Sequence, residues 1–385
     1  MWPFRKTDRQ SVVLIDITAS SVGGAYAHYQ SGQPPTLYFT CREQVHAREG
    51  ETLDAAMLRA LDAVGKTLIE KGAPVLRRET GDGHVDRVVI SVGAPWQDAR
   101  VTTHHIAPGK QFTFSKRMVS EVLAAEVVLP EGHVRAGTAP VAILLNGYVT
   151  PHPIGMQAKR AEIVVLSTSL AAETAELIRT KLRALYHAHD IQFAAFPAVS
   201  YAAMRALYPH QKDFFLLEIG EVNTDLALIK GSMLADTGTL PYGIRSLMTT
   251  LRAAERMSQD EEMGTTTPVT KQPGYTNPSY DARFSTHEEE ARKKWLTELT
   301  DLLKVFAERN ALPRTLFLLT DPVSREYLTW ALQSPILHAL WLSDEPLSIL
   351  PVLPEHLAPQ VRTLAEADAD LYLALLALYQ GTQGQ

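Results

Sequence analysis

The stretch FFLLEIGEVNTDLALIKGSMLADTGTLPYG, residues 214–243, decides the fold of this chain. An apolar run at 214–217 ends at Glu218-Ile219-Gly220, and a second apolar run resumes at 226–229 after a short polar turn. Two apolar runs separated by such a turn predict a β-hairpin.

The turn of this hairpin carries polar side chains suited to binding a cation or a phosphate. Glu218 and Asp225 flank the turn, and Asn223 and Thr224 lie within it. Acidic side chains at strand ends can hold a hydrated cation, and backbone N–H groups in glycine turns can hold phosphate oxygens. The turn is therefore a candidate ligand site.

A second stretch near the N-terminus has the same layout. Residues 11–17 form an apolar run with Asp16 near its end, Thr18-Ala19-Ser20-Ser21 predicts a turn, and apolar residues resume at 22–26. Two strand-acid-turn-strand units far apart in the sequence predict a duplicated fold. The two halves of such a fold can hold one nucleotide phosphate tail between them.

These motifs resemble those of the actin-like ATPase superfamily, in the branch of the division protein FtsA and the pilus assembly protein PilM. Residues 13–17 with Ser20-Ser21-Val22 resemble the first phosphate motif, and 218–220 with 223–225 resemble the second. Residues 145–148 and 152–155 resemble the subdomain peculiar to this branch. The resemblance implies an α/β, two-lobed actin-like fold (ribonuclease H-like and duplicated) with an inserted small α+β subdomain.

The resemblance also implies ATP and Mg²⁺ as cofactors. It assigns Asp16 and Glu218 to Mg²⁺, through water molecules. The other side chains and backbone positions that it assigns to the nucleotide are Thr18, Ser20, Ser21, Gly220, Asn223, Thr224, Asp225, Gly243 and Thr320. For Gly243, a close approach to a ligand and a plain turn before a helix are both open interpretations.

The sequence departs from the family pattern at several of these positions. Thr18 and Glu221 stand where the family usually has glycine, and Gly23 stands where PilM-like proteins often have lysine. Asp321-Pro322 replaces the two glycines of the adenosine motif and would crowd a purine. A carboxylate that faces a phosphate costs free energy unless a cation intervenes. A degenerate nucleotide site is therefore one hypothesis, and an ATPase is the most that the enzyme prediction can be.

Composition excludes several classes of function. The chain has 385 residues, 45% of them hydrophobic, which is enough for two or more domains. It has 37 basic and 43 acidic residues, so nucleic acid is not a predicted partner. Its single cysteine, Cys41, excludes an internal disulfide, and we expect it to be a half-buried strand residue.

The sequence also predicts where the protein acts. No apolar run is long enough to span a bilayer, and residues 1–6 lack the apolar core of a signal peptide. We expect a cytoplasmic protein that a partner can recruit to the inner face of the membrane. The few residues after the last predicted helix leave no room for a membrane-targeting tail of the FtsA type.

Periodicity and the resemblance together predict the order of domains and helices. A helix over 51–71 is expected to end at Gly72, a second to begin with Asp321 as N-cap and Pro322 at its first position, and a closing helix over 366–379 to end at Gly381. The predicted domains are the start of the first lobe (10–92), an inserted partner-binding subdomain (93–190), the return to the first lobe (191–212), the second lobe with a mobile loop at 264–284 (213–355) and the closing helix of the core (356–385).

The resemblance leaves more than one function open. The first hypothesis is a scaffold of type IV pilus assembly, or of a related envelope machine, that docks the cytoplasmic tail of an inner-membrane protein. The second is an FtsA-like division protein that self-associates with ATP, and a more distant third is a sugar or acetate kinase. No Walker loop, Gly-x-Ser-x-Gly or Gly-x-Gly-x-x-Gly motif is present, and no Cys or carboxylate cluster accompanies the histidines at 104–105 and 187–189.

Overall fold

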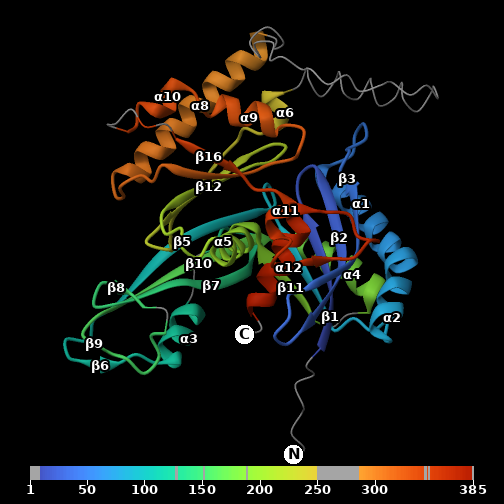
Figure 1. Cartoon of the computed structure of the whole chain (residues 1–385), viewed down its shortest axis with the longest axis horizontal. Coiled ribbons are helices and arrows are strands. Elements are labelled where there is room, and N and C mark those ends of the chain that lie inside the picture. The colour runs from blue at the N-terminus through green and yellow to red at the C-terminus, as the bar shows by residue number, and fades with distance from the viewer. Residues whose placement is uncertain are drawn as a thin grey trace, which may run out of the picture. The chain divides into compact units, whose positions relative to one another are not determined.

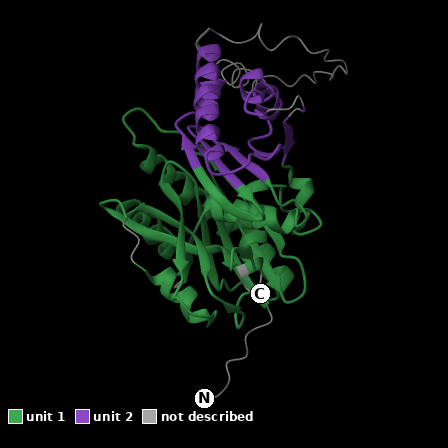
Figure 2. Ribbon diagram, turned by 90° about the vertical axis from the view of Figure 1, so that its left-hand side faces the viewer, with its two compact units in different colours: residues 1–213, 229–237, 352–385 green, residues 214–228, 238–351 purple. Residues whose placement is uncertain are grey.

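The computed structural model describes residues 9–125, 129–150, 152–187, 190–248, 286–341, 345 and 347–383. The chain divides into two compact units, each of which is discontinuous in sequence (Figure 2). Unit 1 comprises residues 1–213, 229–237 and 352–385, and unit 2 comprises 214–228 and 238–351. The predicted insert at 93–190 lies within unit 1, and the predicted second lobe at 213–355 includes all of unit 2.

The main sheet of unit 1 has six strands in the order β11-β4-β1-β2-β3-β17. β1, β2 and β3 form an antiparallel meander, while β4 and β11 extend the sheet in parallel beside β1. The bounds are β1 (Arg9–Ile17), β2 (Ser21–Gln30), β3 (Thr36–Gln44), β4 (Arg87–Val92), β11 (Ile191–Ala195) and β17 (Arg362–Thr363).

Helices cover both faces of this sheet, so β1 is buried on both sides (Figure 1). On one face, Val13, Ile15 and Ile17 share a core with α1 and α4. Because successive strand residues face opposite ways, Asp16 lies on the other face, where α5 and α12 pack. The bounds of these helices are α1 (Leu53–Thr67), α4 (Ala172–Tyr186), α5 (Phe196–Leu207) and α12 (Leu371–Gln383).

The helix predicted to end at Gly72 continues beyond it, so this prediction is wrong. After α1, the π-helical turn η1 (Leu68–Gly72) leads into α2 (Ala73–Thr80), and the left-handed residue that ends the helix is Gly81. Gly72 serves packing instead, because a Cβ there would lie 2.8 Å from the Tyr26 ring and 2.9 Å from the Phe39 ring.

Cys41 lies on β3 and is partly buried, as expected, with its thiol directed to the carbonyl of Val64. Burial, with a smaller effect of Glu43, raises the pKa of the Cys41 thiol to about 12. Since only the thiolate is nucleophilic, we expect iodoacetamide at pH 8 to label the native chain about a thousandfold more slowly than the urea-unfolded chain. Equal labelling rates in the two states would contradict this.

The predicted insert forms its own layer of sheet within unit 1. A four-stranded sheet in the order β5-β10-β7-β8 lies beside a small β6-β9 pair, and α3 packs on β7 and β10. The bounds are β5 (Gln97–Ile106), β6 (Phe112–Thr113), α3 (Lys116–Ala124), β7 (His133–Leu145), β8 (Tyr148–Val149), β9 (Gln157–Ala158) and β10 (Ala161–Ala171). Phe114, Ile163 and Val165 form part of its core.

Unit 2 is organised around the hairpin that the sequence predicts. β12 and β13 are neighbours in a five-stranded sheet of order β14-β13-β12-β15-β16, in which β15 runs parallel to β12 and to β16. The bounds are β12 (Phe214–Ile219), β13 (Thr224–Lys230), β14 (Met233–Leu240), α6 (Ile244–Leu247), α8 (Thr286–Ala307), β15 (Thr315–Leu319), α9 (Arg325–Ala331), α10 (Pro335–His338) and β16 (Ser348–Pro351).

Two further helix boundaries differ from the sequence prediction. α9 begins at Arg325, not at Pro322, and the Asp321 carboxylate accepts bonds from the N–H groups of Val323 and Ser324 in the turn that precedes the helix. α12 begins at Leu371 and runs past Gly381. The short helix α11 (Pro354–Leu357) and β17 occupy the chain just before α12.

The predicted loop at 264–284 and the N-terminal residues 1–6 lie outside the described residues. Within the described ranges, no helix has both the length and the apolar character needed to cross a bilayer.

Candidate functional site

Asp16 stands in a row of residues that crosses the main sheet of unit 1. Its register partners are Gly23 on β2 and Ser91 on β4, and Gly23 in turn is paired with Arg42 on β3. Residues paired in this way point to the same face of a sheet. Arg42 therefore reaches Asp16 across Gly23.

Arg42 uses all three guanidinium nitrogens in bonds to the protein. Nη2 donates to Asp16 Oδ2 at 3.0 Å and to Asp370 Oδ1 at 2.9 Å, and Nε donates to Asp370 Oδ2 at 2.7 Å. Nη1 donates to Ser21 Oγ at 2.8 Å. We call Asp16, Arg42, Asp370 and Ser21 the Arg42 clamp.

Burial sets the charges of this clamp. The Asp16 side chain is 1% exposed, and that burial raises its pKa to about 6, against the lowering effect of Arg42 and with a further raising effect of Asp370. The two carboxylates raise the pKa of Arg42, so its guanidinium stays charged. The clamp therefore places a permanent cation against the acid that was predicted to contact Mg²⁺.

In the predicted phosphate turn after β1, several polar groups are hydrogen-bonded to one another. The Thr18 N–H donates to the Ser21 carbonyl at 2.9 Å, and the Ser21 N–H donates to Thr18 Oγ1 at 3.1 Å. Ser20 Oγ lies 3.2 Å from Thr18 Oγ1. Two backbone N–H groups that could face a phosphate are thus committed to the turn.

Gly23 makes room for the clamp. A Cβ at this position would lie 2.5 Å from Arg42 Nη2 and 2.7 Å from its Cζ. We expect Gly23→Ala to push the guanidinium away from Asp16 and to cost about 1–3 kcal/mol of unfolding free energy, measured by urea denaturation. In an Arg42→Met background the same change is expected to cost much less, and equal costs in both backgrounds would contradict the proposed steric cause.

The predicted second phosphate turn, in unit 2, is also internally bonded. Thr224 Oγ1 donates to the Tyr242 carbonyl at 2.7 Å and accepts a bond from Trp295 Nε1 at 3.1 Å. The Gly220 N–H donates to the Asn223 carbonyl, and Asn223 Nδ2 donates to Asp225 Oδ2 at 2.7 Å. The Thr224 hydroxyl, which is fully buried, is already satisfied by protein groups.

The acids around this turn are buried among partners. Burial raises the pKa of Asp225, while hydrogen bonds from Thr239 and Asn223 hold it down. Glu221, the departure from the family pattern, lies 3.5 Å from the exposed Arg245 guanidinium in an ion pair. Glu218, at the end of β12, is also buried.

Gly243 and Thr320 contact the same turn. A Cβ on Gly243 would lie 2.4 Å from Glu221 C and Val222 N, so the close approach at this glycine is to the protein's own backbone. Ile244 and Arg245 donate their N–H groups to the Gly220 and Glu221 carbonyls. Thr320 Oγ1 donates to the Ile219 carbonyl at 3.2 Å.

The structure thus gathers the predicted residues into two groups, one in each unit. Asp16, Thr18, Ser20 and Ser21 belong to unit 1, and the group from Glu218 to Thr320 belongs to unit 2. A cation shared by Asp16 and Glu218 stays a prediction, as do the nucleotide contacts.

The residues around Asp16 fit a magnesium ion poorly. Mg²⁺ needs about six oxygen ligands near 2.1 Å and keeps several waters, whereas Asp16 is buried and one of its oxygens is bonded to Arg42. In the described ranges, no group of three or more His, Cys, Asp or Glu side chains could hold a metal.

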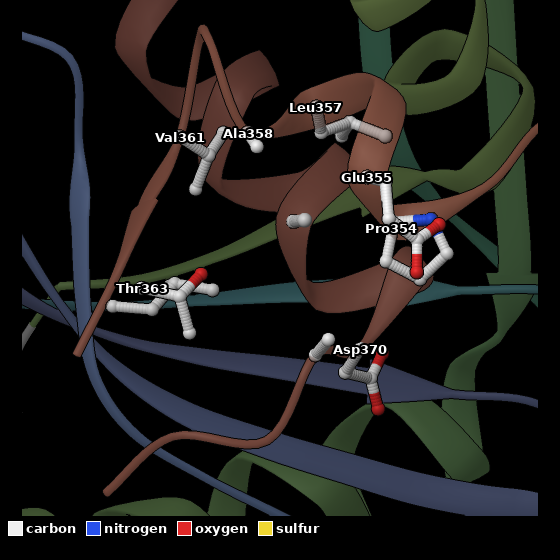
Figure 3. A pocket seen from close by; sticks show the side chains of 10 residues that line it. Pro354, Glu355, Leu357, Ala358, Val361, Thr363 and Asp370 are labelled. Carbon is white, nitrogen blue, oxygen red and sulfur yellow. The ribbon is translucent and has the colours of Figure 1, made fainter. Parts of the chain in front are cut away.

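A small pocket lies beside the clamp in unit 1. Its volume is about 220 Å³, below the roughly 300 Å³ at which small-molecule sites usually begin. Asp370 lines it together with Leu357, Val361, Thr363 and other residues of the 354–374 segment (Figure 3). This pocket is therefore too small to hold a whole adenine nucleotide.

Sequence reasoning missed Arg42 and Asp370. Arg42 follows Cys41 and begins the polar end of its strand, and Asp370 lies far away in the chain, before α12. An arginine in a β-strand normally indicates an exposed position, so the sequence held no signal for a buried clamp.

Comparisons with known proteins show the fold. No family model and no curated protein matches the chain. A chain of a solved PilM-PilN type IV pilus biogenesis complex is 17% identical over 97% of this chain and 98% of its own length, with a TM-score of 0.58. A Bacteroides thetaiotaomicron protein with an actin-like ATPase fold and unknown function is 10% identical over 99% of both chains, with a TM-score of 0.43.

The assignment of the fold rests on the first of these matches and on the α/β layers of the structure. Because the sequence identity is only 17%, this match shows the fold alone. This chain therefore has the actin-like ATPase fold, in a form similar to that of a chain of the PilM-PilN complex.

Proposed function

We propose that this protein is a cytoplasmic actin-like scaffold of type IV pilus assembly, or of a related envelope machine, and that it docks the cytoplasmic tail of an inner-membrane partner. The observation that carries the proposal is the near full-length likeness to a chain of a PilM-PilN complex. The internal bonding of both predicted phosphate turns supports it, because a scaffold needs no phosphate contacts there. Its nucleotide site is accordingly degenerate.

The docking edge in this proposal is the segment formed by residues 148–150 and 152–156. Four large apolar side chains of the segment are exposed, Tyr148 by 78%, Val149 by 41%, Ile154 by 46% and Met156 by 47%. β8, which carries the first two, is the last strand in its sheet. An edge strand offers unpaired backbone groups to an added strand, and neighbouring apolar side chains can hold the residues of that strand.

The test is a capture experiment followed by a direct measurement. The immobilised full chain is mixed with detergent-solubilised inner membranes of its source organism, and retained proteins are identified. We expect an inner-membrane pilus assembly protein with a cytoplasmic tail, and a fluorescent peptide of that tail should bind the full chain in an anisotropy titration. Recovery of division-ring proteins in its place would overturn the pilus assignment.

Substitutions in the docking edge test whether the peptide binds there. Tyr148→Ser combined with Ile154→Ser should weaken peptide binding at least tenfold if the docking edge is correct. Ile336→Ser is the matched control, since Ile336 is an equally exposed apolar residue (45%) of unit 2. Equal affinities of all three proteins would reject the docking edge while leaving the partner identified.

A further inference from the structure

We propose that Arg42 is the built-in cation of the turn that follows β1, and that this turn therefore takes no Mg²⁺-phosphate group. The inference stands on unit 1 alone. It is independent of which partner the protein docks.

Arg42 bonds both Asp16 and Asp370 through a planar fork, at 2.7–3.0 Å, and a bond to Ser21 fixes the remaining nitrogen. Its Cζ also lies 5.7 Å from the centre of the Tyr372 ring. A divalent ion at the same carboxylate would be placed close to this fixed guanidinium, and like charges at such distances repel strongly in a buried site.

Asp16 Oδ1 and Ser91 Oγ occupy paired positions on β1 and β4, both are buried, and neither has a hydrogen-bond partner among the described residues. These two atoms are the strongest evidence for a bound ion. They could supply a metal with one carboxylate oxygen and one hydroxyl, so water and phosphate oxygens would have to complete the octahedral shell of Mg²⁺ beside the fixed Arg42 guanidinium.

A phosphate beside Asp16 would need N–H donors from the turn to offset its charge. The Thr18 and Ser21 N–H groups are bonded within the turn, and Ser21 Oγ accepts a bond from Arg42. Two N–H donors of this turn are therefore already used in stabilising it.

The clamp has a structural role that explains its presence. Asp370 Oδ1 accepts a bond from the Leu373 N–H as well as from Arg42, so the carboxylate that pairs with β3 also caps the first turn of α12. Asp16 adds β1 to the same guanidinium. Arg42 thus fastens the closing helix to the centre of the sheet, and the assembly needs no nucleotide to hold it together.

The test uses Mn²⁺ as the probe for Mg²⁺. The full chain and its Asp16→Asn variant are titrated with Mn²⁺ and ATP, and free Mn²⁺ is measured by electron paramagnetic resonance. Glu121→Gln, on exposed α3, is the control. The proposal expects the same free Mn²⁺ with all three proteins. Binding by the wild type and the control that weakens at least tenfold in Asp16→Asn would overturn it.

Arg42→Lys decides the question if Asp16→Asn does not fold. Lysine keeps the positive charge but lacks the planar fork that bonds two carboxylates, so we expect a lower midpoint of thermal unfolding. The proposal expects that millimolar Mg²⁺, with or without ATP, leaves this midpoint unchanged. Restoration of the wild-type midpoint by Mg²⁺ would overturn it.

Discussion

Arg42→Met is expected to lower the free energy of unfolding by about 3–5 kcal/mol near pH 8, because breaking a buried ion pair leaves an uncompensated charge. The charge left behind is Asp16, which is 1% exposed, while Asp370 at 14% exposure retains some contact with water. Urea denaturation followed by circular dichroism measures the change. A loss below about 1 kcal/mol would show that the pair is as weak as a surface ion pair.

This loss should depend on pH in a defined direction. Burial raises the pKa of Asp16 above its unfolded value to about 6, so the folded state binds its proton more tightly and ionisation of Asp16 destabilises the fold as pH rises through this range. Without Arg42 the folded pKa is higher still, because the cation that lowers it is gone. The stability gap between wild type and Arg42→Met should therefore be smallest near pH 4 and widen above pH 6.

A double-mutant cycle separates the ion pair from the packing of the arginine stem. Asp16→Asn removes the charge that Arg42→Met would leave unpaired, so the double variant should be more stable than Arg42→Met alone at pH 8. A coupling energy of about 1–3 kcal/mol is expected for residues in one network. Additive losses would mean that Arg42 acts through its packing alone.

Gly243→Ala is expected to destabilise unit 2 by about 3 kcal/mol or more, at the upper end of overpacking effects. The added methyl group would lie 2.4–2.5 Å from backbone atoms of Glu221 and Val222, which cannot turn away as a flexible side chain can. The backbone bonds from Ile244 to Gly220 and from Arg245 to Glu221 would be strained together with the turn. The measurement is urea denaturation of the full chain.

Gly220→Ala is the matched control on the same turn. Its added Cβ would lie 3.5 Å from the nearest atom, the Asn223 carbonyl oxygen, which is ordinary van der Waals contact. We expect a change within about 1 kcal/mol, typical of a tolerated substitution. If both variants lost the same stability, the close contact at Gly243 would not be the cause.

The strands and the fold were predictable because they depend on local patterns. The apolar runs at 12–15 and 214–217 are uninterrupted, as expected of strands covered on both faces, and they lie in β1 and β12. The turn residues between the paired strands carried the resemblance to the actin-like fold. Each of these features involves residues that are close together in the chain, so each can be recognised from a single sequence.

The Arg42 clamp was not predictable, because it depends on register and on distant parts of the chain. Gly23 was identified as a departure from the family pattern, but only the pairing of Gly23 with Arg42 shows that a guanidinium lies over it. Asp370 joins from the end of the chain. No local pattern encodes such a contact.

The helix ends predicted from glycine positions were wrong for a physical reason. Gly72 and Gly381 were expected to end helices, yet both lie in continuous helical segments. Gly72 is small because the Tyr26 and Phe39 rings pack against it. A sequence shows that a residue is glycine and does not show whether its backbone or its missing side chain is required.

The central claim is that Asp16 is held by Arg42 and not by a metal, and a crystal structure grown with Mn²⁺ and a non-hydrolysable ATP analogue tests it most directly. The prediction is that Arg42 Nη2 remains about 3.0 Å from Asp16 Oδ2, with no anomalous manganese peak beside that carboxylate. A manganese peak bound to Asp16 directly or through water, with Arg42 displaced, would contradict the account.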